Sequence, residues 1–119
     1  MANELFWVFT LELKPGQLDA FKTMVTQIVP LAHNEPGTLA YQWSLNHDQT
    51  IAHIYERYAD SDAFVSHVEQ TFSHFAERFL SMVNVQSLVV YGEPNAACRK
   101  ALDTFNATYM TLFNGFSRS

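Results

Sequence analysis

Apolar residues occupy every second position from Leu5 to Leu13, and this period of two changes to a helical spacing just after Lys14-Pro15-Gly16. A period of two is typical of a strand with one buried face, whereas apolar residues three and four apart indicate an amphipathic helix. Proline ends the strand because it has no amide hydrogen to donate to a sheet. The sequence therefore predicts a first strand at 5–13, followed by a helix that begins near Leu18 and ends before Pro36-Gly37.

The same two periods recur along the rest of the chain and predict the order of its elements. Residues 39–45 and 50–58 alternate like the two strands of a hairpin around a polar turn. A helical stripe then starts at the capping residues 60–62 and continues to Met82, a fourth strand covers 85–91, and a last helical pattern extends from Asn95 to Gly115. This βαββαβ order with an extra C-terminal helix predicts an α+β, ferredoxin-like fold with an antiparallel sheet and helices on one face.

The length and apolar content indicate one core. With 119 residues, 48% of them apolar, the chain can bury a continuous core. We expect residues 1–93 to form the ferredoxin-like domain, and residues 94–119 to form a helical extension packed on the same domain or on a dimer partner. The first, second and fourth strands carry large apolar residues on both faces, so the sheet face away from the helices needs a cover. We therefore predict a homodimer in which a second copy covers that face.

The charge pattern bounds the partners. The formal charge is −5, and the seven Lys and Arg residues are scattered rather than gathered in a stripe, so nucleic acid and anionic membranes are poor candidates. No apolar run approaches the ~20 residues of a transmembrane helix. The chain has one cysteine, Cys98, and no signal-peptide pattern, so we expect a cytoplasmic protein. Neighbouring cations at 99 and 100 could lower the pKa of Cys98, but a cysteine without a chemical role is favoured.

Several familiar cofactor motifs are absent from the sequence. Its four glycines are too widely spaced for a dinucleotide or nucleoside triphosphate loop, and its five histidines include no HExxH pair. There is no GxSxG nucleophile motif either. We therefore expect an enzyme of this sequence to work without a bound cofactor or metal, with acid–base side chains inside an aromatic cavity.

His67 is the first candidate for such chemistry because it lies in the apolar stripe of the second predicted helix, with Phe64 one turn before it and Thr71 one turn after it. On the preceding strand, alternation places Glu56 and Tyr58 on one face. If that face looks at the helices, the Glu56 carboxylate could orient His67, and a carboxylate-supported imidazole is a plausible general base. The alternative is that Glu56 and His67 satisfy each other as a structural pair, and both readings remain open.

Aromatic side chains supply the candidate binding surface. Trp7, Tyr41 and Trp43 present flat apolar rings with polar tips, which suit a planar aromatic ligand between sheet and helices. Thr71 and Phe72 on the second helical stripe complete the predicted substrate-binding set. The alternative reading of these aromatic residues is that they belong to the core.

Three segments together resemble a known family. KPGQLDAF at 14–21, HNEPGTLAYQW at 33–43 and YERYADSDAFVSHVEQTFSHF at 55–75 are similar to the antibiotic biosynthesis monooxygenase domain, over about residues 4–93. The resemblance implies a dimeric α+β barrel with a pocket between sheet and helices in each subunit. It also implies that the catalytic positions of the family fall on Glu56, Tyr58 and His67. A haem-degrading member would carry an iron-binding histidine where this sequence has Glu77, so that branch is disfavoured.

The resulting hypothesis is a cofactor-independent monooxygenase that acts on a small phenol, quinol or polycyclic aromatic molecule. In it, His67 removes a phenolic proton and the electron-rich anion reduces dioxygen, while Glu56 and Tyr58 set the protonation states. One alternative is a non-oxidative isomerase or cyclase that uses the same base without dioxygen. Another is a ligand-binding module without turnover. The expected partners are a small aromatic substrate, dioxygen and a second copy of the chain.

Overall fold

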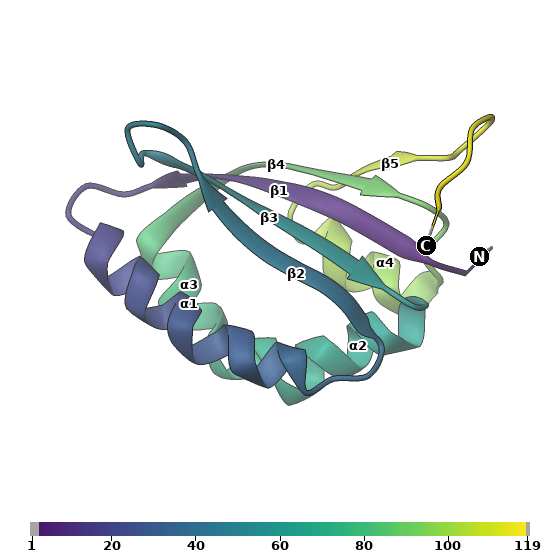
Figure 1. Ribbon diagram of the computed structural model, residues 1–119, viewed down its shortest axis with the longest axis horizontal. Helices are drawn as coiled ribbons and strands as arrows, with labels where there is room; N and C mark the ends of the chain where they lie inside the picture. The colour runs from purple at the N-terminus through teal and green to yellow at the C-terminus, as the bar shows by residue number, and fades with distance from the viewer. Residues whose placement is uncertain (1–2, 119) are drawn as a thin grey trace.

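The computed structural model describes residues 3–118 (Figure 1). Residues 1 and 2 of the expected domain 1–93 and residue 119 of the expected extension 94–119 lie outside the described residues. In chain order, its elements are β1 (Leu5–Leu13), α1 (Leu18–His33), β2 (Thr38–Leu45), β3 (Ile51–Tyr58), α2 (Ser61–Gln70), the 3-10 helix η1 (Phe72–His74), α3 (Ala76–Met82), β4 (Val83–Tyr91), α4 (Ala96–Asp103) and β5 (Thr108–Met110). The predicted α+β, ferredoxin-like βαββαβ order is confirmed, and β1 has the predicted bounds.

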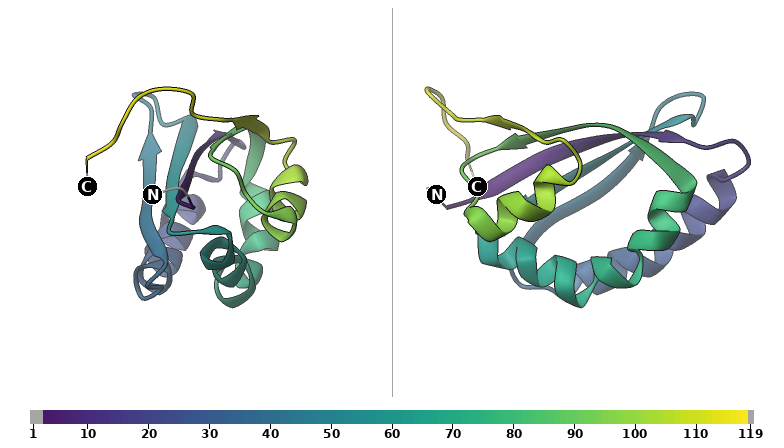
Figure 2. Two further views of the ribbon diagram at one scale, coloured as in Figure 1. Left: turned by 90° about the vertical axis from the view of Figure 1, so that its right-hand side faces the viewer. Right: turned by 180° about the vertical axis from the view of Figure 1, so that it is seen from behind.

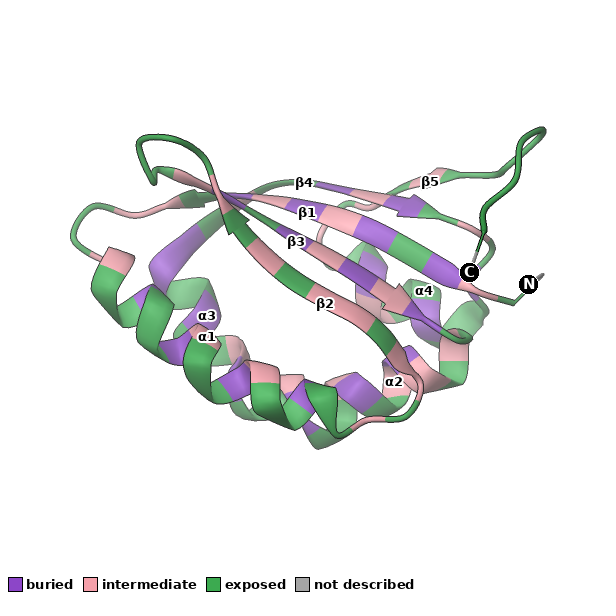
Figure 3. Cartoon of the chain, in the orientation of Figure 1, coloured by how far each residue is buried: buried purple, intermediate pink, exposed green. Residues whose placement is uncertain are grey.

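The strands form one five-stranded sheet in the order β2-β3-β1-β4-β5. β1 pairs antiparallel with β3 and β4, and β2 pairs antiparallel with β3, whereas the short β5 pairs parallel with β4. Helices α1, α2 and α3 lie under one face of this sheet (Figures 1 and 2). The buried residues gather between the sheet and these helices, which places the core in that layer (Figure 3).

The register of the sheet brings three chemically distinct side chains together on its inner face. Glu56 on β3 is paired with Trp7 on β1 and with Tyr41 on β2. Because successive side chains of a strand alternate between faces, the buried residues Ile54 and Tyr58 share the inner face with Glu56. The face of β3 that looks at the helices is therefore the one that carries the carboxyl group and the phenol.

The second predicted helix is broken in the structure. It was expected to run from 60–62 to Met82, but α2 ends at Gln70 and is followed by η1 and the separate α3. Thr71 has φ −124° and ψ −66°, outside the helical range, and its hydroxyl donates to the Glu35 side chain. A threonine whose hydroxyl has an alternative partner competes with helix continuation, which accounts for a break at this position. Of the expected capping residues at 60–62, Asp60 is the cap, and its Oδ1 accepts a hydrogen bond from the Ala63 amide at 2.8 Å.

The last predicted helix, from Asn95 to Gly115, is wrong beyond its first half. Only α4 is helical, and the chain then turns at Asn106, which has a left-handed φ of 56°, before it adds β5 to the edge of β4. The edge of β4 offers backbone partners that a continued helix would leave unused, and β-branched Thr108 and aromatic Tyr109 suit a strand. α4 itself packs against α2 of the same chain.

The outer face of the sheet carries exposed aromatic side chains. The Phe6 and Tyr91 rings stack with their centroids 4.9 Å apart, and Tyr55 lies 6.2 Å from Phe6 on the other side. Met110 on β5 is also exposed. The predicted homodimer, which would cover this face, stays a prediction. Among residues 3–118 no helix has the length and apolar content needed to span a membrane.

Candidate functional site

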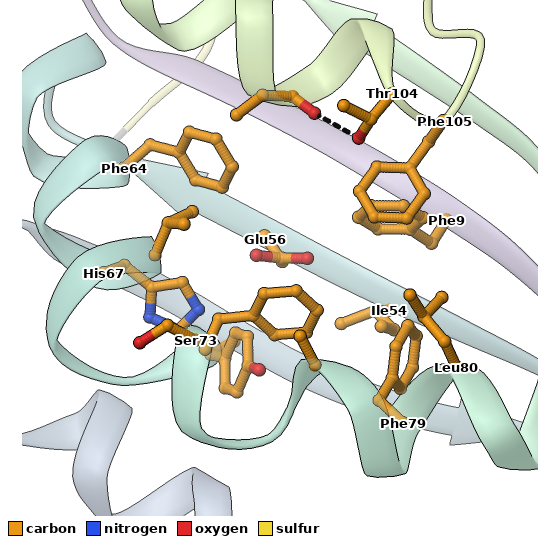
Figure 4. Close-up of a pocket in the computed structure, with 15 residues that line it drawn as sticks. Phe9, Ile54, Glu56, Phe64, His67, Ser73, Phe79, Leu80, Thr104 and Phe105 are labelled. Carbon is orange, nitrogen blue, oxygen red and sulfur yellow. Dashed lines mark hydrogen bonds between the residues drawn. The ribbon is translucent and has the colours of Figure 1, made fainter.

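A cavity of about 430 Å³ lies between the inner face of the sheet, the α2–α3 segment and the end of α4. Its walls are mainly apolar, and the described residues that line it include no Lys or Arg. Figure 4 shows His67 and Phe64 on one side of Glu56, and Phe9, Phe105 and Leu80 on the other. The lining residues are Phe9, Tyr41, Ile54, Glu56, Phe64, His67, Val68, Phe72, Ser73, Ala76, Phe79, Leu80, Ala101, Thr104 and Phe105.

His67 is held by a carboxylate that sequence reasoning missed. Its Nδ1 lies 2.8 Å from Oε1 of Glu35, and its side chain is only 2% exposed. The same Glu35 carboxylate accepts hydrogen bonds from the hydroxyls of Thr38, at 2.7 Å, and of Thr71. Three side-chain donors thus converge on Glu35, which fixes the position of the carboxylate and, through it, the orientation of the imidazole ring.

The turn between α1 and β2 brings Glu35 to α2. Gly37 in this turn packs so closely on α2 that an added Cβ atom would lie 2.6 Å from Cβ of Ala63. The carbonyl of Gly37 also accepts a hydrogen bond from the Ala59 amide at 2.9 Å, which ties the turn to the start of α2. A side chain at position 37 would push the turn away, so glycine is needed here for close approach.

The bond to Glu35 leaves the other ring nitrogen of His67 for chemistry. When Nδ1 donates its hydrogen to a carboxylate, Nε2 carries the lone pair and can accept a proton. Within residues 3–118, no hydrogen bond to Nε2 of His67 is found. Because His67 is a lining residue, this arrangement presents a base to a cavity with mainly apolar walls.

Glu56 has a different environment from Glu35. It is 5% exposed and accepts a 2.5 Å hydrogen bond from the Tyr58 hydroxyl. Burial raises the pKa of the Glu56 carboxyl above its ordinary value, and the nearby His67, the Tyr58 hydroxyl and the Trp7 indole oppose that rise only in part. The Trp7 indole N–H has no full hydrogen bond among the described residues. Compared with water, the environment therefore shifts the balance of Glu56 toward its neutral acid form, the form that can donate a proton.

The two tyrosines beside Glu56 remain protonated at neutral pH. Burial, followed by the charges of Glu56 and Glu35, raises the pKa of Tyr41 well above its ordinary value. Burial and the adjacent Glu56 likewise raise the pKa of Tyr58. Both phenols therefore act as hydrogen-bond donors rather than bases.

The predicted site residues fall into two groups. Of the predicted catalytic residues, His67 and Glu56 line the cavity, whereas Tyr58 is fully buried behind Glu56. Of the predicted substrate-binding residues, Tyr41 and Phe72 line the cavity. The other three do not: Trp7 is fully buried and packs on Tyr58 and Phe64, Trp43 packs between Phe21 and Phe79, and Thr71 is bonded to Glu35.

The expected pairing of Glu56 with His67 is replaced by the pairing of His67 with Glu35. The segment HNEPGT contained a signal for Glu35, because an acidic residue in a short turn between a helix and a strand can reach a neighbouring helix. Glu35 and His67 are 32 residues apart in the sequence, so no local spacing pattern indicates that they are in contact. The C-terminal addition forms part of the cavity wall through the lining residues Ala101, Thr104 and Phe105.

Other reactive groups lie outside this arrangement. Cys98 is buried, and burial raises the pKa of its thiol to about 11, so the suggestion that its cationic neighbours lower the pKa is wrong. In the part of the chain that the structure describes, no group of three or more His, Cys, Asp or Glu side chains is placed to hold a metal ion.

The fold and the cavity define the class: a ferredoxin-like α+β protein with a ligand-sized pocket between its sheet and its helices. Within that class, the chain belongs to the antibiotic biosynthesis monooxygenase family, whose sequence model matches residues 5–78. A comparison with curated proteins gives no significant match.

Solved structures show the same fold. MupZ from Pseudomonas fluorescens is 24% identical and has a TM-score of 0.83, over 98% of this chain and 95% of its own. Rv0793 from Mycobacterium tuberculosis is 14% identical with a TM-score of 0.68, over 79% and 98%. PA3566 from Pseudomonas aeruginosa is 22% identical with a TM-score of 0.62, over 76% and 91%. The likeness to MupZ thus extends across the C-terminal addition, whereas the other two cover about the length of the ferredoxin-like part.

Proposed function

We propose that this protein is a cofactor-independent monooxygenase that oxidises a small phenolic, quinol or polycyclic aromatic molecule bound in the cavity. The observation that carries the proposal is the Glu35-bound His67 at the wall of a mainly apolar cavity, with the acid Glu56 beside it. An apolar cavity of about 430 Å³ suits a ligand of this size. Membership of the monooxygenase family favours oxidation as the reaction.

In the proposed reaction, Nε2 of His67 takes the hydroxyl proton of the substrate. The resulting phenolate is electron-rich and reduces dioxygen, so that one oxygen atom enters the ring and the other leaves as water while a phenol becomes a quinone. The overall change consumes one dioxygen for each ring C–H and O–H pair that is lost, and no external reductant is needed. The departing oxygen atom takes two protons as it becomes water: Glu56 donates one, and His67 gives back the one that it took from the hydroxyl. The ring C–H proton, released as the quinone forms, then restores the proton of Glu56.

The surroundings of the acid and the base assist this chemistry. The walls exclude water, which strengthens the electrostatic interactions of the bound anion with nearby protein donors. Tyr41, whose phenol stays protonated, lies with its ring centroid 5.2 Å from that of His67 and could donate a hydrogen bond to the substrate oxygen. Phe64 and Phe72 supply aromatic surface against which a planar ring can stack.

The test is dioxygen uptake by the purified protein with a chelator present and no added cofactor, over a panel of hydroquinones and polycyclic phenols. We expect uptake above substrate autoxidation that falls by about 10²-fold to 10⁴-fold in His67→Ala, the usual contribution of a positioned base. His74→Ala is the matched control, because His74 lies in η1 and is exposed outside the cavity lining. Full activity of His67→Ala would contradict the assignment of the base.

A second candidate is a non-oxidative isomerase or cyclase. The observation that favours it is the pairing of a base, His67, with a carboxyl group of raised pKa, Glu56, because such a pair can remove a proton at one atom and deliver a proton to another. Turnover of a substrate under strict anaerobic conditions, with product of unchanged elemental composition, would select this candidate. Ligand binding without turnover in either atmosphere would leave the protein as a binding module.

The predicted homodimer belongs to this proposal. The exposed Phe6 and Tyr91 and the half-buried Tyr55 form an aromatic group on the outer sheet face, and a second copy related by a two-fold axis would cover it. Analytical sedimentation of the wild type and of Phe6→Glu distinguishes a monomer from a dimer. We expect a dimer that the buried charge disrupts, and a wild-type monomer at micromolar concentration would contradict the prediction.

A further inference from the structure

The cavity has a polar end and an apolar end. His67 lies on one side of Glu56, whereas Phe9, Phe105 and Leu80 lie on the other (Figure 4). A ligand with a single hydroxyl group would place that group at the His67 end, where a base and an acid can bind it. The remainder of the ligand would then extend toward Phe105.

The mouth of the cavity lies at this apolar end. Three lining residues are exposed to solvent. Ser73 in η1 lies beside His67, whereas Leu80 in α3 and Thr104 just after α4 lie on the apolar side of Glu56 (Figure 4). Leu80 and Thr104 therefore mark an opening at the apolar end, between α3 and the turn that follows α4. Phe105 in that turn is half-buried, and its ring packs edge to face on Phe9 with the centroids 5.3 Å apart.

The turn that carries Phe105 is held by a set of contacts that we call the Tyr109 latch, made of Arg99, Asp103 and Tyr109. The Tyr109 hydroxyl donates to Oδ1 of Asp103 at 2.6 Å, and the Arg99 guanidinium lies 3.8 Å above the Tyr109 ring. Backbone pairing of Tyr109 with Val90 joins the latch to β4. Because α4 and β5 are both anchored, the short connection between them has little freedom and Phe105 is kept at the mouth.

We propose that Phe105 sets the size limit of the ligand: its ring is the end stop that the apolar part of the ligand meets at the mouth. This inference rests on the proposed function, because it takes the cavity as the ligand site with the polar group of the ligand at His67. The ligand class that fits is an uncharged, hydroxyl-bearing molecule with one apolar extension, since no Lys or Arg among the described lining residues would balance a charged tail. The family match ends at residue 78, so the end stop comes from the C-terminal addition.

The test measures the affinity of a series of 4-n-alkylphenols by titration calorimetry, without any turnover. In the wild type, we expect affinity to rise about fourfold with each added methylene until the chain meets Phe105, and then to stay level. In Phe105→Ala, the rise should continue for about two methylene groups or more, because the removed ring leaves space that the surroundings fill only in part. Phe113→Ala is the matched control, since Phe113 is 98% exposed and lies outside the lining.

A second variant keeps the test decisive if Phe105→Ala does not fold. Thr104 is exposed at the mouth, so Thr104→Trp adds bulk there without entering the core, and it should move the level region to shorter chains. Equal break points in the wild type and in both mouth variants would overturn the end stop while leaving the ligand site intact. Failure of the wild type to bind any member of the series would overturn the proposed ligand class and the end stop together. A break point that Phe113→Ala also shifts would overturn the end stop alone.

Discussion

The two carboxyl groups beside His67 have opposite environments. Glu35 lies in the turn between α1 and β2, is 17% exposed, and accepts hydrogen bonds from three side chains. Glu56 lies in the middle of β3, is 5% exposed, and has one side-chain donor, the Tyr58 hydroxyl. In the proposed function, the same residue type is therefore a positioning group in one place and a proton donor in the other. The number of donors and the access to water decide which role each carboxyl can perform.

The difference follows from where the chain places each group. A turn at the edge of the fold lets Glu35 collect donors from β2 and α2 while it stays near solvent. The centre of an inner strand surrounds Glu56 with Trp7 and Tyr41, whose rings add little polar compensation. Substitutions at the two carboxyl groups and at their hydrogen-bond donors test this difference. We expect the largest effects on the turnover rate and the smallest on the free energy of unfolding.

The largest effect is expected from removing the acid. Glu56→Gln keeps the shape of the side chain and its ability to accept from Tyr58, but it has no proton to donate at neutral pH. We expect the turnover rate to fall by about 10²-fold to 10⁴-fold, the usual contribution of a general acid. Initial rates of dioxygen uptake at saturating substrate measure this. Ligand affinity should change little, and a variant that loses affinity but keeps its rate would show that Glu56 binds rather than reacts.

A smaller loss of activity is expected at the positioning carboxylate. Glu35→Gln keeps one side-chain oxygen and replaces the other with an amide nitrogen, which cannot accept a hydrogen bond. Since His67 and Thr38 are bonded to Oε1 and Thr71 to Oε2, the variant loses at least one of these bonds and also the charge that strengthens the bond to His67 Nδ1. We expect a fall of about tenfold to a hundredfold in rate, as for other groups that orient a histidine.

The pH profile separates this role from a merely structural one. If Glu35 holds the tautomer of His67, Glu35→Gln should displace the alkaline and acid limbs of the rate profile, and Glu35→Asp should restore part of the rate. An unchanged profile with a lower melting temperature would assign Glu35 to the fold alone.

The fold was largely predictable because its signals are local. The alternation in Leu5–Leu13 and the stripe from Leu18 are each produced by one element packing on one core, so sequence period and burial agree. The helix expected up to Met82 failed because a single residue, Thr71, found a partner in Glu35, and the helix expected up to Gly115 failed because β4 offered an open edge. Both failures arise from contacts made across the fold, which period alone cannot show.

The site was predictable in part for the same reason. His67 and Glu56 stood out because a polar residue in an apolar stripe, or on an inner strand face, needs a partner. The partner of His67 and one wall of the cavity come from elsewhere in the chain: Glu35 is 32 residues before His67, and Phe105 lines the cavity from a turn in which Asn106 has a left-handed φ. Such contacts depend on tertiary placement, and sequence spacing gives no measure of it.

A further difference between the carboxyls should appear in the pH dependence of stability. Because the native state holds the proton of Glu56 more tightly than the unfolded state does, unfolding releases a proton, and stability falls as pH rises through the raised pKa. Between the unfolded and native pKa values the slope is about 1.4 kcal/mol per pH unit. Chemical denaturation from pH 4 upward should show this decline in the wild type and its absence in Glu56→Gln. Parallel curves for the two proteins would mean that Glu56 ionises without cost.

The smallest effects are expected from the hydroxyl donors, and they compare the two carboxyls most directly. Tyr58→Phe removes the one side-chain donor of Glu56, whereas Thr71→Val removes one of three at Glu35. Each should cost about 1 kcal/mol of unfolding free energy at neutral pH.

The two variants should differ in the pH dependence of stability. Tyr58→Phe should raise the pKa of Glu56 further, because the hydroxyl now opposes the effect of burial on that pKa. The decline of stability with rising pH should then extend to higher pH. Thr71→Val should leave that decline in place because Glu35 keeps two donors, and Thr71→Ser should recover the lost stability. If both variants shifted the decline equally, the decline would not report the environment of Glu56 alone.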